Sequence, residues 1–458
     1  MIAASGICWI AFAFAGTTIQ DEAKREKADE GKTADRAADK SAPTPPARVS
    51  PDTVAECQQA QKKFRDGDFN EAKKLLDAAA AKHPELPPSQ VMMAALLLTG
   101  NRVAEGRAYL ERAAIERPEH PEVNRHFGEL ALAEGRLCDA EVQFDRAAQL
   151  AGNESWSLKQ RQTFLSQAYA GLAAVAERRS DWNAAFAKLY LLRELEKDNP
   201  RVRWRLGRAQ FYKGKTDDAQ TLFQSAWQAD NTLEPAELTM GALWAQKKEF
   251  AKAEKLLAEA VKTYPKDART HAGLASFFLE QSRLNEARTA ARAGLQADPN
   301  HLQLRLLDAV IARAGGELDY AERAIQELVA KHPSDFGATN QLALVLSDQE
   351  EPRKRAQGLD IATNNQKLYP NNIEAVTTLG WAMYRNGLLD RAEQALHSAV
   401  RTNQGSSDCA YYLAVVWMER GKRDDAKKLL EMAIAAPGTF VHRKDCQDLL
   451  AKASEKKP

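Results

Sequence analysis

The sequence has almost no net charge and carries few residues in the patterns that mark enzymes. Lysine plus arginine number 64 against 63 acidic residues in a chain of 458, so no overall field attracts nucleic acid or anionic lipid. Its five cysteines form no CxxC pair, and neither a zinc knuckle nor a redox dithiol is predicted. HExxH and Gly-x-Ser-x-Gly are also absent from the sequence. These absences favour a non-enzyme without cofactor, metal or nucleic acid.

One short segment resembles part of a nucleotide-binding motif. Lys213-Gly214-Lys215-Thr216 matches the end of a phosphate-binding loop, but the first glycine of such a loop would fall at Ala209. The segment also follows a helical pattern rather than a strand. We therefore predict an ordinary turn between two helices.

The first twenty residues differ in composition from everything after them. The stretch from Ile2 to Ile19 is uncharged and apolar, and Ala13-Phe14-Ala15 offers a cleavage site before Gly16. Residues 1–20 are therefore predicted to be a signal peptide that directs export to a periplasmic or extracytoplasmic location. No Lys or Arg precedes the run, so an N-terminal membrane anchor stays open as the alternative.

Residues 21–51 form a second distinct segment. It is rich in Ala, Lys, Asp and Glu and ends in the proline-rich stretch from Ser41 to Pro46. Such a composition buries too little apolar surface to offset chain entropy. We expect a disordered charged tether.

Prolines recur through the rest of the chain at the ends of apolar-periodic segments. Pro84 and Pro118 are 34 residues apart, and so are successive members of the series Pro265, Pro299 and Pro333. A 34-residue period is that of a stacked helix-turn-helix array. Alanine-rich segments with few β-branched runs support an all-α fold.

Each period repeats the same order of small and large residues. Leu206-Gly207, Gly214, Ala219 and Phe223 recur in kind as Leu379-Gly380, Gly387, Ala392 and Leu396, and again 34 residues later as Leu413-Ala414, Gly421, Ala426 and Leu430. A missing side chain lets two helices approach closely, and the large apolar residue fills the space beyond. This order resembles the tetratricopeptide repeat family. The C-terminal stretch also resembles tetratricopeptide proteins associated with exopolysaccharide export in bacteria.

The resemblance implies an all-α, right-handed superhelical solenoid of about eleven helix-turn-helix repeats over residues 52–438. The interval from Gly152 to Asn231 is eleven residues longer than two periods, and that from Pro333 to Pro370 is three longer than one. Irregular insertions are therefore expected near 153–165 and 350–356. Residues 439–458 are predicted to form a capping helix and tail, because a solenoid end needs a polar cover.

Four cysteines lie beyond the predicted signal peptide. Only Cys409 and Cys446 fall on what should be neighbouring helices. In an exported protein they could form a disulfide, whereas the alternative is that they are buried as small hydrophobic residues.

In the resembling family the first helices of the repeats line a concave groove, and here they carry the aromatic and Arg residues typical of binding hot spots. The candidates for partner binding are Arg201, Trp204, Arg208, Phe211 and Tyr212 in the repeat that starts at Pro200, Trp381, Tyr384 and Arg385 in the repeat that starts at Ile373, and Tyr411 in the last repeat. Packing of Trp204 or Trp381 into the core is an equally open interpretation.

The function predicted on this basis is a non-catalytic protein-interaction scaffold in envelope assembly, secretion or polysaccharide export. Two alternatives stay open. One is a carbohydrate- or polymer-binding module in which Trp204, Tyr212, Trp381 and Tyr384 serve as stacking platforms. The other is a regulatory subunit of an enzyme on a separate chain.

Overall fold

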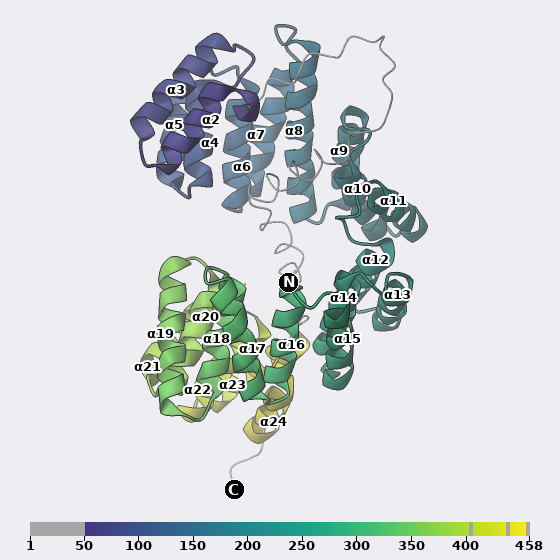
Figure 1. Cartoon of the computed structure of the whole chain (residues 1–458), viewed down its shortest axis with the longest axis vertical. Helices are drawn as coiled ribbons and strands as arrows, with labels where there is room; N and C mark the ends of the chain where they lie inside the picture. The colour runs from purple at the N-terminus through teal and green to yellow at the C-terminus, as the bar shows by residue number, and fades with distance from the viewer. Residues whose placement is uncertain (1–50, 403–405, 437–439, 455–458) are drawn as a thin grey trace. The chain divides into compact units, whose positions relative to one another are not determined.

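The computed structural model describes residues 51–402, 406–436 and 440–454, and within them the chain is helical throughout (Figure 1). It holds 23 α-helices and one short 3-10 helix there, without a strand. The described residues form two compact units, an N-terminal unit that ends at Ala236 and a C-terminal unit that starts at Glu237. Each unit is described by itself.

The N-terminal unit contains the 3-10 helix and ten α-helices. They are η1 (Pro51–Thr53), α2 (Ala55–Arg65), α3 (Phe69–Lys82), α4 (Ser89–Thr99), α5 (Val103–Glu116), α6 (Pro121–Ala133), α7 (Leu137–Ala151), α8 (Leu158–Arg178), α9 (Trp182–Leu195), α10 (Pro200–Tyr212) and α11 (Thr216–Ala229).

The C-terminal unit contains the remaining helices, the first of which begins at the unit boundary. They are α12 (Ala236–Gln246), α13 (Phe250–Thr263), α14 (Ala268–Glu280), α15 (Leu284–Ala297), α16 (Leu302–Ala314), α17 (Leu318–Lys331), α18 (Phe336–Asp348), α19 (Pro352–Leu368), α20 (Ile373–Arg385), α21 (Leu389–Arg401), α22 (Ser407–Glu419), α23 (Arg423–Ala435) and α24 (Arg443–Ser454).

Consecutive helices form eleven pairs, from α2 with α3 to α22 with α23, and α24 follows the last pair. The predicted all-α array of about eleven helix-turn-helix repeats is thus confirmed. We call the even-numbered helix of each pair the first helix and the odd-numbered one the second helix.

Close approach within a pair depends on the glycines that the sequence pattern singled out. A Cβ atom added at Gly207 would lie 2.8 Å from the ring of Phe223, and one added at Gly380 would lie 2.6 Å from Leu396. Phe223 and Leu396 are both fully buried. The small residue on the first helix therefore makes room for the large one on the second.

The turn inside ten of the eleven pairs contains one residue in the left-handed backbone region, and the turn between α18 and α19 is the exception. Gly214 has φ of 83°, where glycine carries no steric cost, whereas Lys248 and Ser282 hold the equivalent turns at 61° and 59°. Four pairs thus form the same turn with a residue other than glycine, since Asn101 and Ser180 adopt it as well. The repeat geometry overrides the local preference at these positions.

Two helices are longer than their counterparts. The first helix α8 has 21 residues, whereas its neighbours α6 and α10 each have 13. The second helix α19 has 17 residues against 14 in α17. In both regions where the sequence exceeds the 34-residue period, the extra residues include added helical turns.

Two cysteines near the C-terminal end of the array, Cys409 on α22 and Cys446 on α24, are free thiols. Cys409 and Cys446 are both fully buried in one hydrophobic cluster, and burial raises the pKa of each thiol to about 12. They occupy the core as small hydrophobic residues, which is the alternative that the sequence left open. Cys57 is likewise buried, and Cys138 is exposed.

The predicted signal peptide or anchor (residues 1–20) lies outside the described residues, and so does the predicted tether up to residue 50. Among the helices of the described ranges, none combines the length and apolarity that a membrane span requires.

Candidate partner-binding surfaces

The candidates on α10 divide between the core and the surface. Phe211 is fully buried and Trp204 is 7% exposed, so their side chains pack inside the N-terminal unit and offer a partner almost no area. Arg201 is exposed, and Arg208 and Tyr212 are partly so. Trp204 therefore packs in the core, which is one of the two interpretations that the sequence left open. Phe211 does the same, because both side chains lie at the interface between helices.

An aromatic stack links α10 to α9. The ring of Tyr212 stacks on that of Trp182, with centroids 4.1 Å apart and planes 12° from parallel. The guanidinium of Arg208 lies 5.7 Å from the Trp182 ring centre and 5.4 Å from that of Trp204. Such cation–π contacts hold Arg208 in a fixed position. Sequence reasoning missed Trp182, since it begins a second helix.

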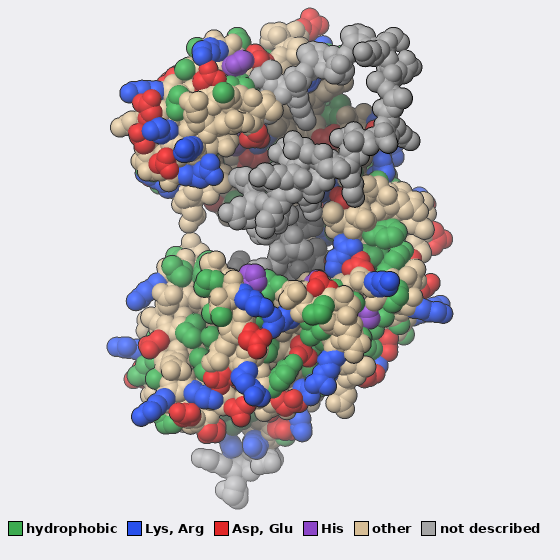
Figure 2. Space-filling model, in the orientation of Figure 1, with side chains coloured by type: hydrophobic (Ala, Val, Ile, Leu, Met, Phe, Trp, Pro, Cys, Tyr) green, Lys and Arg blue, Asp and Glu red, His purple; other side chains and the backbone are tan. Residues whose placement is uncertain are grey.

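Two other arginines of α10 are engaged in ion pairs. Arg205 contacts Glu177 of α8 at 3.1 Å, and Arg203 contacts Asp198 at 3.8 Å. The face of the molecule in Figure 2 shows acidic and basic side chains interspersed over its surface. The Asp198 side chain is fully exposed, so its pair with Arg203 stabilises the fold by little, whereas the side chains of Arg205 and Glu177 are only 23% and 16% exposed.

Trp381 of α20 lies at the centre of a second aromatic cluster, in the C-terminal unit. It is 4% exposed, and its indole N–H donates to the Asp348 carboxylate at 2.8 Å. Its ring stacks on Tyr412 (centroids 4.2 Å apart, 15°) and on Tyr384 (5.3 Å, 27°). Tyr384 is partly exposed and Tyr411 is 9% exposed. The rings therefore pack mainly against one another.

Beneath this cluster lies an ion pair that the sequence did not reveal. Arg313, near the end of α16, contacts Asp348, at the end of α18, with 2.7 Å between Nε and Oδ2. The two side chains are 2% and 10% exposed. Arg313 also donates to the Tyr412 hydroxyl at 3.0 Å. Its guanidinium holds the pKa of Asp348 below the usual range, although burial of that carboxyl acts in the opposite direction.

Arg385 lies at the rim of the same cluster. Its Nη2 donates to the backbone carbonyl oxygens of Asp348 at 3.2 Å and Gln349 at 3.4 Å, and it pairs with the Glu350 carboxylate at 3.4 Å. Both Arg385 and Tyr384 remain partly exposed. They are the candidates of the C-terminal unit that a partner can reach.

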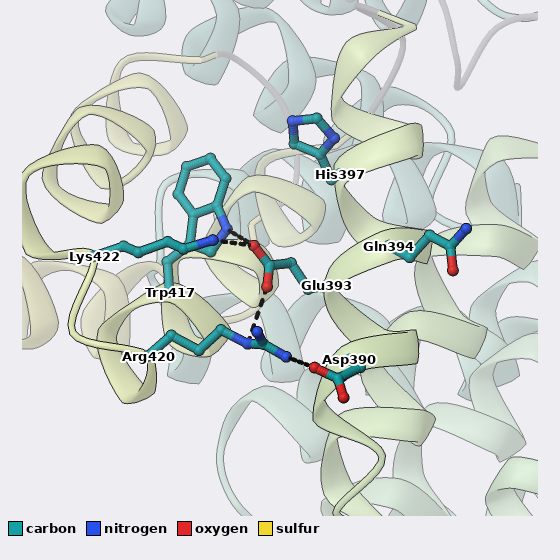
Figure 3. A pocket seen from close by; sticks show the side chains of 7 residues that line it. All are labelled: Asp390, Glu393, Gln394, His397, Trp417, Arg420 and Lys422. Carbon is teal, nitrogen blue, oxygen red and sulfur yellow. Dashed lines mark hydrogen bonds and ion pairs between the residues drawn. The ribbon is translucent and has the colours of Figure 1, made fainter.

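A shallow recess of about 440 Å³ lies between α21 and α22 (Figure 3). The Glu393 carboxylate at its centre accepts from Trp417 at 2.8 Å and from Lys422 at 2.6 Å, and it pairs with Arg420 at 2.9 Å. The Lys422 contact contributes most to lowering the pKa of Glu393. The Glu393 carboxylate is therefore held by two hydrogen bonds and an ion pair, and the His397 ring lies at the edge of the recess beside Trp417 (Figure 3).

No group of three or more His, Cys, Asp or Glu side chains among the described residues is arranged to hold a metal ion. Within each unit the arrangement is that of a helical-repeat protein: helix pairs follow one another, and each packs on its neighbours along the chain.

Sequence models of the tetratricopeptide repeat match residues 63–123, 210–277 and 377–439. The chain belongs to the tetratricopeptide repeat superfamily.

Similar proteins are known from sequence and from structure. A tetratricopeptide repeat-containing protein of Pseudomonas aeruginosa, PA4667, is 28% identical over 112 residues, which are 24% of this chain and only 19% of that protein. The crystal structure of yeast Tom70 is 13% identical, with a TM-score of 0.38 over 87% of this chain and 95% of that one. A tetratricopeptide repeat protein from Parabacteroides merdae is 11% identical, with a TM-score of 0.43 over 56% of this chain and 99% of that one.

Proposed function

We propose that this chain is a non-catalytic scaffold that binds partner proteins on the first helices of its repeats. Tetratricopeptide arrays are generally protein-interaction scaffolds. The observation that carries the proposal is the set of accessible Arg and Tyr side chains on first helices, namely Arg201, Arg208, Tyr212, Tyr384 and Arg385. Arg and Tyr combine large contact area with directed hydrogen bonds and are enriched at binding hot spots.

The proposed setting is envelope assembly, secretion or polysaccharide export in a bacterium. The apolar run from Ile2 to Ile19 supports it, because such a run directs a chain out of the cytoplasm. Sequencing the N-terminus of the mature protein tests this step. A start near Gly16 would support export by cleavage, and an intact Met1 in a soluble cytoplasmic fraction would contradict it.

The aromatic rings that the polymer-binding alternative requires are covered by neighbouring side chains. A sugar ring stacks on an open aromatic face, but Trp381 has Tyr412 and Tyr384 against its ring, and Tyr212 is stacked on Trp182. Trp204 is nearly buried. The edges of the tyrosines suit protein contacts better than carbohydrate stacking.

Site-specific photocrosslinking in the producing cell tests the proposal. A photoreactive amino acid replaces Arg201 or Arg385 on first helices. In the matched controls it replaces Gln224 on α11 or Lys428 on α23, which are exposed positions on second helices. We expect the first-helix positions to crosslink to a defined protein that the second-helix positions do not reach. Equal crosslinking from both faces, or turnover of a substrate by the isolated chain, would contradict the scaffold.

A further inference from the structure

The chain's own C-terminal segment lies against the first helices of the C-terminal unit. Residues 440–443 contain Phe440, Val441 and His442, which precede α24, and Arg443, its first residue. Phe440 is 2% exposed. Val441 packs on the hydrophobic cluster formed by α14, α15 and α16.

The contacts of this segment reach far back along the array. The Nη2 atom of Arg313 on α16 lies 3.1 Å from Nε2 of His442, which is 129 residues away in the sequence. Arg443 faces Glu280 of α14, whose pKa is raised by burial to about 7. A helix that only covered the last repeat would touch α22 and α23 and no more. Residues 440–443 therefore lie across several first helices, as a bound peptide would.

The site recognises the side chains of the segment. The His442 ring stacks on Tyr411 with centroids 5.1 Å apart and planes 18° from parallel, and Phe440 packs edge-on against Tyr411 at 6.2 Å. Arg313 can only donate, so Nε2 of His442 accepts, and its Nδ1–H donates to Asp445 at 3.1 Å. These contacts select an imidazole next to an aromatic side chain.

The site also recognises the backbone of the segment. Asp408, at the start of α22, accepts from the His442 amide at 3.4 Å, and its carboxylate also receives the amide of Val441. Hydrogen bonds to consecutive amides do not depend on the side chains and would form with any chain in the same conformation. Main-chain anchoring with side-chain selection is the usual logic of a peptide-binding site.

We propose that the first-helix face around Arg313, Asp408 and Tyr411 is a peptide-binding site, which residues 440–443 occupy in cis. The partner that fits it is a protein segment with an aromatic residue, an aliphatic residue and then histidine followed by a basic residue. This inference rests on the proposed scaffold function and names the ligand of one site. The tethered segment competes with any partner, because its effective concentration is high.

A synthetic peptide with the sequence of residues 437–445, labelled with fluorescein, tests the site on the full chain by fluorescence anisotropy. The variant Phe440→Ala/His442→Ala weakens the tethered occupant and leaves the site intact. Lys444→Ala is the matched control, because Lys444 is exposed on the same segment. We expect the double variant to bind the peptide at least about tenfold more tightly than wild type or the control. A scrambled peptide should not bind.

Adding Asp408→Asn to the double variant should reduce binding of the peptide at least about tenfold, because the anchor of the backbone amides is weakened. Equal binding by the double variant and the Lys444→Ala control, or no effect of Asp408→Asn, would overturn the proposal.

If the double variant shows no cooperative thermal transition, His442→Ala alone replaces it, and about threefold tighter binding than wild type is expected. If that variant also fails to fold, the segment is an integral part of the core and the proposal is wrong. Crosslinks from Arg201 to a partner, together with a failed peptide assay, would leave the scaffold function standing and refute only this site.

Discussion

The buried ion pair between Arg313 and Asp348 gives the sharpest test of how the C-terminal unit is stabilised. The substitution Arg313→Met keeps most of the side-chain volume but removes the charge that faces Asp348. Asp348 then retains the Trp381 N–H as a hydrogen-bond donor but no longer has the paired cation. Removing one partner of a buried pair costs about 3–5 kcal/mol, because the other charge is left uncompensated.

The double substitution Arg313→Met/Asp348→Leu separates this penalty from the net contribution of the pair. Replacing both charges with apolar residues is often neutral or stabilising. We therefore expect the double variant to recover part of the stability that Arg313→Met loses, because the Trp381 N–H, which loses its acceptor, still costs about 1–3 kcal/mol. The exposed pair Lys428–Asp425, with side chains 74% and 60% exposed, supplies the control, and Lys428→Ala should change stability by less than about 0.5 kcal/mol.

The assay is urea unfolding of the full chain, followed by circular dichroism and by tryptophan fluorescence, which detects Trp381 in its stack. Asp348 has a lowered pKa in the folded wild type, so its contribution to stability is present above its unfolded pKa and is lost as the pH falls. In the Arg313→Met variant the buried carboxyl of Asp348 can instead take up a proton. The loss of stability relative to wild type should therefore shrink from pH 7 toward pH 4. A loss below about 1 kcal/mol at pH 7, or a double variant as unstable as the single one, would refute the reasoning.

Four further changes have defined outcomes. Lys248→Gly should stabilise the chain by about 0.5–1 kcal/mol in urea unfolding, because glycine carries no cost at φ of 61°; a loss would contradict the strain argument. Gly207→Ala should lower thermal stability by about 1–3 kcal/mol, since the added Cβ would overlap a buried ring. Burial raises the pKa of Glu374 to about 7. The stability that its protonated form contributes is therefore complete below the unfolded pKa and is lost as the pH rises through 7. The substitution Glu374→Gln should stabilise the chain by about 1–3 kcal/mol at pH 8 and by little at pH 4. In maleimide labelling, the exposed Cys138 should react at once and the buried Cys446 only after unfolding; comparable rates would show that α24 opens freely.

The repeat architecture could be predicted from the sequence because its determinants are local. Gly207 and Phe223 belong to one helix pair, 16 positions apart, and the same spacing separates Gly380 from Leu396. The residues that determine packing within a pair therefore lie within that pair, and the repetition of their pattern along the sequence indicates the array. The left-handed turns at Lys248 and Ser282 escape such reasoning, because neither residue signals a turn that glycine usually forms.

The candidate sites were predictable only in part. The pattern of aromatic and Arg residues on first helices includes Tyr384 and Arg385, which are partly exposed, but it gave no warning that Phe211 is fully buried. A first helix contacts both its partner helix and the next repeat, and a period of 34 does not distinguish a residue at that interface from one at its edge. Arg313 looked like any helix-surface arginine, since its partner His442 is 129 residues distant.

The contrast between Arg313 and Arg385 shows what decides the role of a charged residue in such an array. Both side chains contact Asp348. Arg313 pairs with the carboxylate of Asp348, and Arg385 donates to the backbone carbonyl of Asp348. The first contact buries a full charge pair, which is costly to break and therefore fixes the packing of α16 against α18. The second is one of two hydrogen bonds from Arg385 to backbone carbonyls, and with Glu350 as its ion-pair partner this guanidinium stays partly exposed at the rim. A partner that offers a carboxylate could exchange contacts with Arg385 at low cost, whereas Arg313 is held in place by Asp348 and presents its Nη2 donor to the proposed peptide-binding site.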